Sequence, residues 1–235
     1  MAGLASNIIG KGFEVLFRAI KHVRHDRPIH PRGLRLEGSV VVHAHGLSSG
    51  VAWVDEPGEN TVTARLSRSA GTPDGLPDIA GLAVRVHHDD DGPGPSTFSD
   101  ILLSSTGWSF PSRFVLVPCL RVSAASLTTM MPYRGNDGPV LLGARTLSPR
   151  GLPLSLRGFR RSLGAAPWHL GLFFAQPRGG WQRFGTLTLG LSPEEEGNLR
   201  FDAILHPLAG ARTYGWAREV RERSYALARR EPGDW

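Results

Sequence analysis

Residues 60–68, Asn-Thr-Val-Thr-Ala-Arg-Leu-Ser-Arg, illustrate the strand pattern of this chain, because side chains of two kinds alternate along them. Ala64 and Leu66 share one face of an extended chain, while Arg65 and Ser67 share the other. This period of two is typical of a strand that buries one face and exposes the other. We therefore expect a strand here, with a polar face opposite the core.

Seven further segments have the same texture, and Gly, Pro or Asp residues at their ends indicate turns. They are residues 36–43, 81–88, 99–104, 139–147, 168–176, 181–191 and 199–205. About eight strands at hairpin-like spacing predict an antiparallel barrel or sandwich. Residues 110–135 are less regular, with a helix expected around Ser123–Met131. A closing helix is expected from Tyr214 to Arg230.

The composition is that of one globular, turn-rich domain: the 235 residues include 29 Gly and 18 Pro. Basic residues number 27 against 21 acidic ones, and the excess of Arg suits carboxylate or phosphate ligands. These charges are scattered without interleaved aromatic residues, which argues against nucleic-acid binding. Cys119 is the one cysteine, which excludes a disulfide framework and indicates a reducing compartment, the cytoplasm. No apolar run approaches the ~20 residues of a membrane span.

Residues 1–25 are expected to form a basic amphipathic helix ahead of the main domain, residues 26–235. The apolar positions recur at spacings of three and four, at Ile9, Phe13, Leu16, Ile20 and Val23. Most apolar stripes of this kind pack on the domain or on a partner subunit. The alternative is a helix that lies on a membrane surface.

Two histidine pairs have the residue types of a metal site. His43 and His45 are two apart, so both side chains can share one face of a strand. His87 and His88 precede three aspartates at 89–91. No spacing places a third ligand beside His43 and His45, so we expect these two at a half-exposed strand edge. The second pair precedes Gly and Pro residues, so we expect it in a solvated turn.

Three motifs are more informative together. They are Arg27-Pro-Ile-His-Pro-Arg-Gly33, then Thr63–Gly71 continued by Asp78–Arg85, and finally Arg221-Glu-Arg-Ser-Tyr225. In order and type they resemble the haem-catalase superfamily, whose patterns are R-x-x-H-x-x-G, V-R-F-S-x-x-x-G with D-x-R-G-F-A-x-K, and R-x-x-x-Y. The match covers under half of the chain. It implies an α+β fold, a catalase-like antiparallel β-barrel of about eight strands with flanking helices.

The resemblance also implies a b-type haem. Tyr225 would be its iron ligand, and a helical spacing of four places Arg221 one turn away on the same face. A phenol with a pKa of ~10 binds iron well as the phenolate, which a ferric ion and a guanidinium both favour. His30 would be the distal acid/base, with Ser67 behind it.

The haem propionates would be held by arginine. Arg27 and Arg65 correspond to family residues of that role, and Arg229 or Arg230 is a candidate third. A planar guanidinium that is always charged suits bidentate recognition of a carboxylate.

The sequence departs from the family where the latter has D-L-V-G-N-N-T-P, since this chain reads Asp-Ile-Leu-Leu-Ser-Ser-Thr-Gly over 100–107. The distal asparagine is replaced, by Ser104 or Ser105. A hydroxyl is a shorter and differently placed donor than a carboxamide, which would change how a peroxide is oriented. Ala80 stands where the family has an arginine.

With a chain this short, the resemblance is closest to the short catalase-related haem proteins of bacteria. It implies a peroxidase that reduces hydrogen peroxide or organic hydroperoxides through an oxidised haem intermediate, using a small reductant, with weak or no true catalase activity. A homo-oligomer is expected. Two alternatives stay open: a haem-binding protein without turnover, and a haem-free barrel that binds lipid at a membrane through the N-terminal helix.

Overall fold

A computed structural model describes residues 33–88, 97–164, 166–194 and 199–217. Its strands are β1 (Gly33–Val42), β2 (Gly58–Arg68), β3 (Ala80–His88), β4 (Thr97–Thr106), β5 (Ser126–Thr128), β6 (Tyr133–Gly135), β7 (Gly138–Ser148), β8 (Trp168–Ala175), β9 (Gln182–Leu191) and β10 (Arg212–Thr213). The described chain also forms the α-helices α2 (Ala52–Asp55) and α3 (Leu156–Leu163), and 3-10 turns lie at Ser112–Phe114 and Val122–Ala124.

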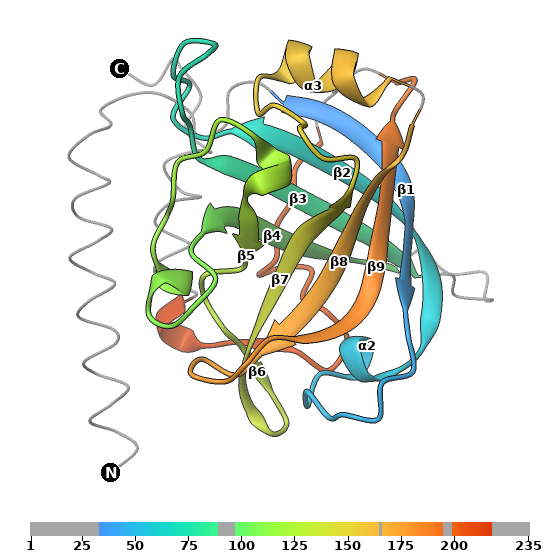
Figure 1. Cartoon of the computed structure of the whole chain (residues 1–235). Coiled ribbons are helices and arrows are strands. Elements are labelled where there is room, and N and C mark those ends of the chain that lie inside the picture. Colours follow the sequence, from blue (N-terminus) through green and yellow to red (C-terminus); the bar gives the residue numbers. More distant parts are fainter. Residues whose placement is uncertain (1–32, 89–96, 165, 195–198, 218–235) are drawn as a thin grey trace, which may run out of the picture.

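Eight of these strands close into an antiparallel barrel (Figure 1). Their order is β7-β5-β4-β3-β2-β1-β9-β8, and pairing between β7 and β8 closes the ring. Strands β6 and β10 extend the sheet beyond β7. The predicted α+β class, with an antiparallel barrel of about eight strands, is confirmed.

The apolar side chains of alternate strand positions fill the barrel. On β2, Ala64 and Leu66 are fully buried, as their period of two predicts. Helix α3 crosses one end of the barrel (Figure 1). It buries Phe159 and Leu163, and the Phe159 ring meets Trp168 edge-on with 5.2 Å between ring centroids. The core therefore continues from the barrel into this helix.

The helix predicted around Ser123–Met131 is wrong. A 3-10 turn at Val122–Ala124 leads directly into strand β5, which joins β4 to β7. Without these three residues the ring would be open between β4 and β7, so pairing with two long neighbours overrides any local helix preference.

The strand predicted at 199–205 is also wrong, because residues 199–202 have no regular structure and residues 203–205 form a turn. The backbone amide of Asp202 donates to the Asp100 carboxylate at 2.7 Å, and the Arg200 carbonyl accepts from Arg85 at 2.7 Å. Side chains of β3 and β4 thus form hydrogen bonds with backbone groups of this segment that would otherwise pair with a neighbouring strand.

Several predicted segments lie partly or wholly outside the described residues. The helix at 1–25 is outside them, and so is the aspartate run at 89–91. Of the closing helix, residues 215–217 are described and are helical. Among the described residues no helix is long and apolar enough to cross a membrane.

Candidate functional site

The face of β2–β4 that points away from the core carries a row of small residues. Strand pairing aligns Ser67 with Gly81 and Gly81 with Ser104. The two serines are two strands apart, which is about 10 Å in an antiparallel sheet. Arg65 and Ala83, also paired with each other, continue this face along the strands. We call these five residues the outer-face site.

The adjacent serines on β4 point to opposite faces of the sheet. Ser104 is half-buried, belongs to the outer-face site, and makes no side-chain hydrogen bond within the described chain. Ser105 is 1% exposed, and its hydroxyl accepts from the Ala80 amide at 3.0 Å and donates to the Val117 carbonyl at 2.8 Å. Ser105 therefore supports the backbone, whereas Ser104 has a hydroxyl available to a ligand.

Ser67 and Arg65 lie on the β2 part of the site. Ser67 is buried and its hydroxyl donates to the Gly81 carbonyl at 3.3 Å. Arg65 is half-buried and is aligned with Arg35 of β1. Arg35 forms ion pairs with Glu37 at 3.0 Å and Glu194 at 2.6 Å, so the charge of this second arginine is balanced by carboxylates.

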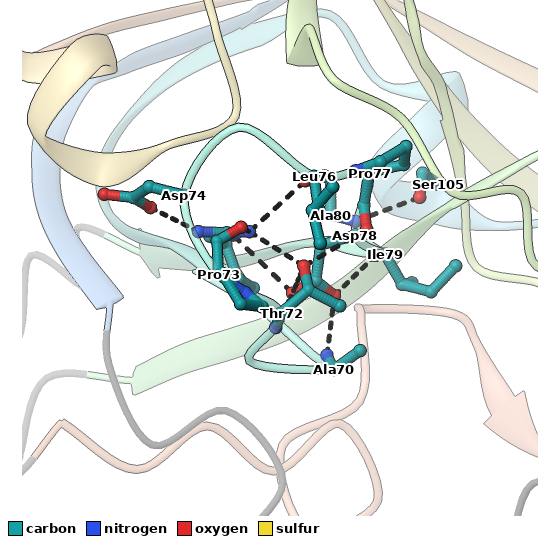
Figure 2. Close-up of polar contacts among 11 residues, drawn as sticks. Ala70, Thr72, Pro73, Asp74, Leu76, Pro77, Asp78, Ile79, Ala80 and Ser105 are labelled. Atoms are coloured by element: carbon teal, nitrogen blue, oxygen red, sulfur yellow. Dashed lines mark hydrogen bonds and ion pairs between the residues drawn. The ribbon is translucent and has the colours of Figure 1, made fainter.

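The loop that joins Ser67 to Gly81 is held by a buried carboxylate, Asp78 (Figure 2). Asp78 is 1% exposed and accepts from the backbone amides of Ala70 at 2.6 Å and Thr72 at 2.9 Å. Burial by itself raises the pKa of Asp78, but these bonds, with others from the Ile79 amide and the Thr72 hydroxyl, outweigh it and lower the pKa below its ordinary value. The ionised carboxylate thus shapes the turn between the two strands.

Cys119 lies beside this loop, and its backbone pairs with that of Asp78. Burial raises the pKa of the Cys119 thiol above its usual value. The thiol is therefore protonated at neutral pH, which is not the state in which cysteine acts as a nucleophile or metal ligand.

A second buried carboxylate, Asp100, fastens the far end of the same strands. Its two oxygens accept from Arg85 Nε and a terminal guanidinium nitrogen, both at 2.8 Å. Asp100 is fully buried, and the guanidinium lies 3.9 Å from the centre of the Phe98 ring. The bidentate geometry and the stacking make this pair a rigid clamp.

The two histidines of the first pair, His43 and His45, contact different residues and share no ligand-like site in the described chain. His43 Nε2 contacts the Thr186 hydroxyl at 3.0 Å, and His45 Nε2 donates to the Val54 carbonyl at 2.9 Å. Among the described residues no group of three His, Cys, Asp or Glu side chains is arranged to hold a metal ion.

Of the predicted site residues, the structure brings Arg65, Ser67 and Ser104 onto one face and puts Ser105 on the other. Five predicted site residues lie outside the described chain: Arg27, His30, Arg221, Tyr225 and Arg229. Sequence reasoning missed the roles of Asp78, Arg85 and Asp100, although all three lie within the segments that carry the family resemblance. The signal for Arg85 and Asp100 was a pair of opposite charges on two neighbouring predicted strands. Asp78 lies in the loop before β3, where alternation gives no signal.

Comparison with solved structures finds that this fold is similar to that of catalases. A fungal catalase matches with a TM-score of 0.60 and 12% identity, over 92% of this chain and 62% of that one. A bacterial catalase matches with a TM-score of 0.59 and 13% identity, over 92% of this chain and 59% of that one. The chain thus spans about three-fifths of the length of these catalases.

Comparisons by sequence find no counterpart: no protein-family model matches, and no curated protein matches. At these identities the structural likeness concerns the fold. The chain has a catalase-like fold, as its motifs predict.

Proposed function

We propose that this protein is a haem-dependent peroxidase that reduces hydrogen peroxide or organic hydroperoxides with a small reductant. The observation that carries the proposal is the outer-face site of a catalase-like barrel. There the half-buried Ser104 hydroxyl, which has no protein partner in the described chain, lies in one row with Ser67.

The described part of this face fits a planar macrocycle. Ser67, Gly81 and Ser104 form one row of small residues over the width of three strands, and the next row along the strands is Arg65, Ala83 and Leu102. A flat ligand can approach the first of these rows without displacing a large side chain. Arg65, on the same face, supplies a positive charge suited to a propionate.

Tyr225 would hold the iron through its phenolate oxygen, with Arg221 favouring the anion from one helical turn away. Arg27 and Arg65 would bind the propionates, and Arg229 is a third candidate. Bound haem would supply the iron at which the O–O bond of the peroxide is reduced.

His30 would take a proton from the bound peroxide and return it to the departing oxygen. Ser67 would orient the imidazole through its other ring nitrogen. Ser104, and not Ser105, would stand in the place of the family's distal asparagine, because only Ser104 shares a face with Ser67. A single hydroxyl orients hydrogen peroxide less firmly than a carboxamide, so we expect weak true catalase activity.

The test is the absorption spectrum of the purified full chain supplied with haemin. We expect a Soret band, a high-spin ferric spectrum and a tyrosinate charge-transfer band, and Tyr225→Phe should abolish the latter. The matched control is Tyr214→Phe, which removes a phenol whose pKa burial raises and which therefore stays protonated. This control should keep the spectrum of the wild type. Absence of a Soret band in the wild type would overturn the proposal.

Turnover is tested separately, with hydrogen peroxide and cumene hydroperoxide as substrates. We expect reductant-dependent consumption of both, lowered about 100-fold or more by His30→Gln, in line with loss of a general acid/base. A Soret band without turnover would instead favour the haem-binding protein that the replaced amide also suggests.

A further inference from the structure

One stretch of this chain carries almost only positive charge. Between Ile101 and Pro193 there are ten arginines, no lysine, and a single acidic residue, Asp137. This stretch includes β5, β7, α3, β8 and β9, which form one side and one end of the barrel. The excess of arginine is therefore concentrated in space and is not spread evenly over the surface.

Five of these arginines gather at the barrel end that α3 covers. The backbone amide of Leu154, just before α3, donates a hydrogen bond to the Leu120 carbonyl at 2.8 Å. The backbones of Arg121 and Pro153 form an isolated antiparallel β-bridge. This brings residues 120–121 beside the segment from Ser148 to α3. The cluster is Arg121, Arg150, Arg157, Arg160 and Arg161, which we call the α3 arginine cluster.

All five side chains are exposed, and none has an ion pair or side-chain hydrogen bond with any residue in the described chain. By contrast, Arg35, Arg68 and Arg85 each have a carboxylate partner. Arginines placed close together without counter-charges repel one another and attract anions. A second copy docked by two-fold symmetry would bring the same charges face to face, so an anionic partner of another kind fits better.

Exposed leucines accompany the cluster. Leu120 is 53% exposed and Leu147 is 40% exposed, and each is close in sequence to an arginine of the cluster. The one aromatic residue of α3, Phe159, is buried, so this helix offers no ring for stacking on a nucleic-acid base. Aliphatic side chains between arginines suit the headgroup region of a bilayer, where the leucines enter the acyl boundary and the guanidinium groups meet phosphates.

We propose that the α3 arginine cluster, with Leu120 and Leu147, is a docking surface for an anionic phospholipid membrane. The barrel end that carries it is also the end of β2 and β4 that carries Ser67 and Ser104, as the strand pairing shows. Docking would hold this end of the barrel at the membrane whether or not haem is bound.

The test is co-sedimentation of the full chain with vesicles of phosphatidylcholine containing 30% phosphatidylserine, and with vesicles of phosphatidylcholine alone. We expect binding to the anionic vesicles that is released by 0.5 M NaCl. Arg160→Gln/Arg161→Gln should weaken it about 25-fold, at roughly fivefold per arginine near an anionic surface. The matched control, Arg178→Gln/Arg183→Gln, removes the same charge from exposed positions at the other end of β8 and β9 and should bind within about twofold of the wild type.

The variant Leu120→Ser distinguishes binding to a membrane from binding to another polyanion such as DNA. It keeps every charge but removes an apolar contact, so it should weaken vesicle binding about fivefold and leave any binding to duplex DNA unchanged. If both double variants lost vesicle binding equally, the binding would depend on net charge or on another segment, and the proposal would be overturned. Binding to duplex DNA in preference to anionic vesicles would also overturn it.

Discussion

At the scale of single residues, the neighbours Ser104 and Ser105 have opposite surroundings and should differ in their effect on stability. Ser105→Ala removes the acceptor of the Ala80 amide and the donor to the Val117 carbonyl, both buried. We expect the free energy of unfolding to fall by about 2 kcal/mol. Ser104→Ala breaks no hydrogen bond in the described chain and should change it by less than about 0.5 kcal/mol. Urea unfolding at pH 7 measures both, and equal losses would contradict the assignment of the two faces.

Asp78 gives the protein an acid-sensitive loop. Its pKa is lowered in the folded state, whereas an unfolded aspartate titrates near ~3.9. Its contribution to stability is therefore complete above about pH 4 and is lost as the pH falls through the lowered value. The Asp78 carboxylate accepts hydrogen bonds from several backbone amides, whereas the carboxamide in Asp78→Asn has only one acceptor oxygen. We therefore expect Asp78→Asn to lower the free energy of unfolding by about 3 kcal/mol at pH 7.

The check for Asp78 is urea unfolding between pH 7 and pH 3. The wild type should lose stability below about pH 4 more steeply than Asp78→Asn does. The control is Glu59→Gln, because Glu59 is exposed and forms no ion pair or side-chain hydrogen bond in the described chain. Substitution of such a surface carboxylate changes the free energy of unfolding by less than about 0.5 kcal/mol, so this variant should behave like the wild type. Parallel pH profiles for Asp78→Asn and the wild type would refute the role given to this carboxylate.

At the scale of elements, the clamp between Arg85 and Asp100 determines where the segment 199–206 lies. Both partners come from adjacent strands, and their free capacity for hydrogen bonding goes to the Arg200 carbonyl and the Asp202 amide. Arg85→Met leaves the fully buried Asp100 carboxylate without its cation. We expect a loss of about 3–5 kcal/mol, together with faster proteolysis within 199–206.

Limited proteolysis followed by mass spectrometry locates the cleavage sites of this variant, and urea unfolding measures its stability. Arg200→Gln is the control, because Arg200 contributes its carbonyl and its side chain is exposed. It should unfold and be cleaved like the wild type. If Arg85→Met were cleaved no faster than this control, the clamp would not be what holds the segment.

The elements also show where local patterns predict structure well. The long strands of the barrel follow from alternation and from turn residues, both of which are properties of neighbouring positions. Strand β5 has only three residues, too few to display a period. The segment 199–205 has alternation but no free strand edge, because the clamp takes its backbone groups. Pairing partners distant in sequence decided both cases.

At the scale of the whole molecule, haem binding should raise the stability of the entire barrel if the proposed function is correct. Free haemin at about 100 times its Kd adds about 2.7 kcal/mol to a protein that binds it only when folded. For a chain of this length that is a rise in Tm of roughly 5–10 °C. Tyr225→Phe should lose part of this rise, and differential scanning calorimetry measures it.

Protoporphyrin IX without iron is the matched control ligand, because it has the same ring and propionates but no metal to bind a phenolate. It should stabilise the wild type less than haemin does, and stabilise Tyr225→Phe as much as the wild type. Equal stabilisation by both ligands in both proteins would indicate an apolar binding site without iron ligation, as the lipid-binding alternative requires.

Composition and local patterns were enough to predict the period-two strands of the barrel, the many turns and the excess of arginine, because each depends on composition or on residues near one another in the chain. Three ordered motifs indicated the catalase-like fold, which the structural comparisons support. The tertiary structure was needed to show that Ser104 rather than Ser105 shares a face with Ser67, since register across β3 sets which side chains share a face. It was also needed to place Arg121 with the other four arginines of the α3 arginine cluster, because the segment before β5 pairs with the segment before α3.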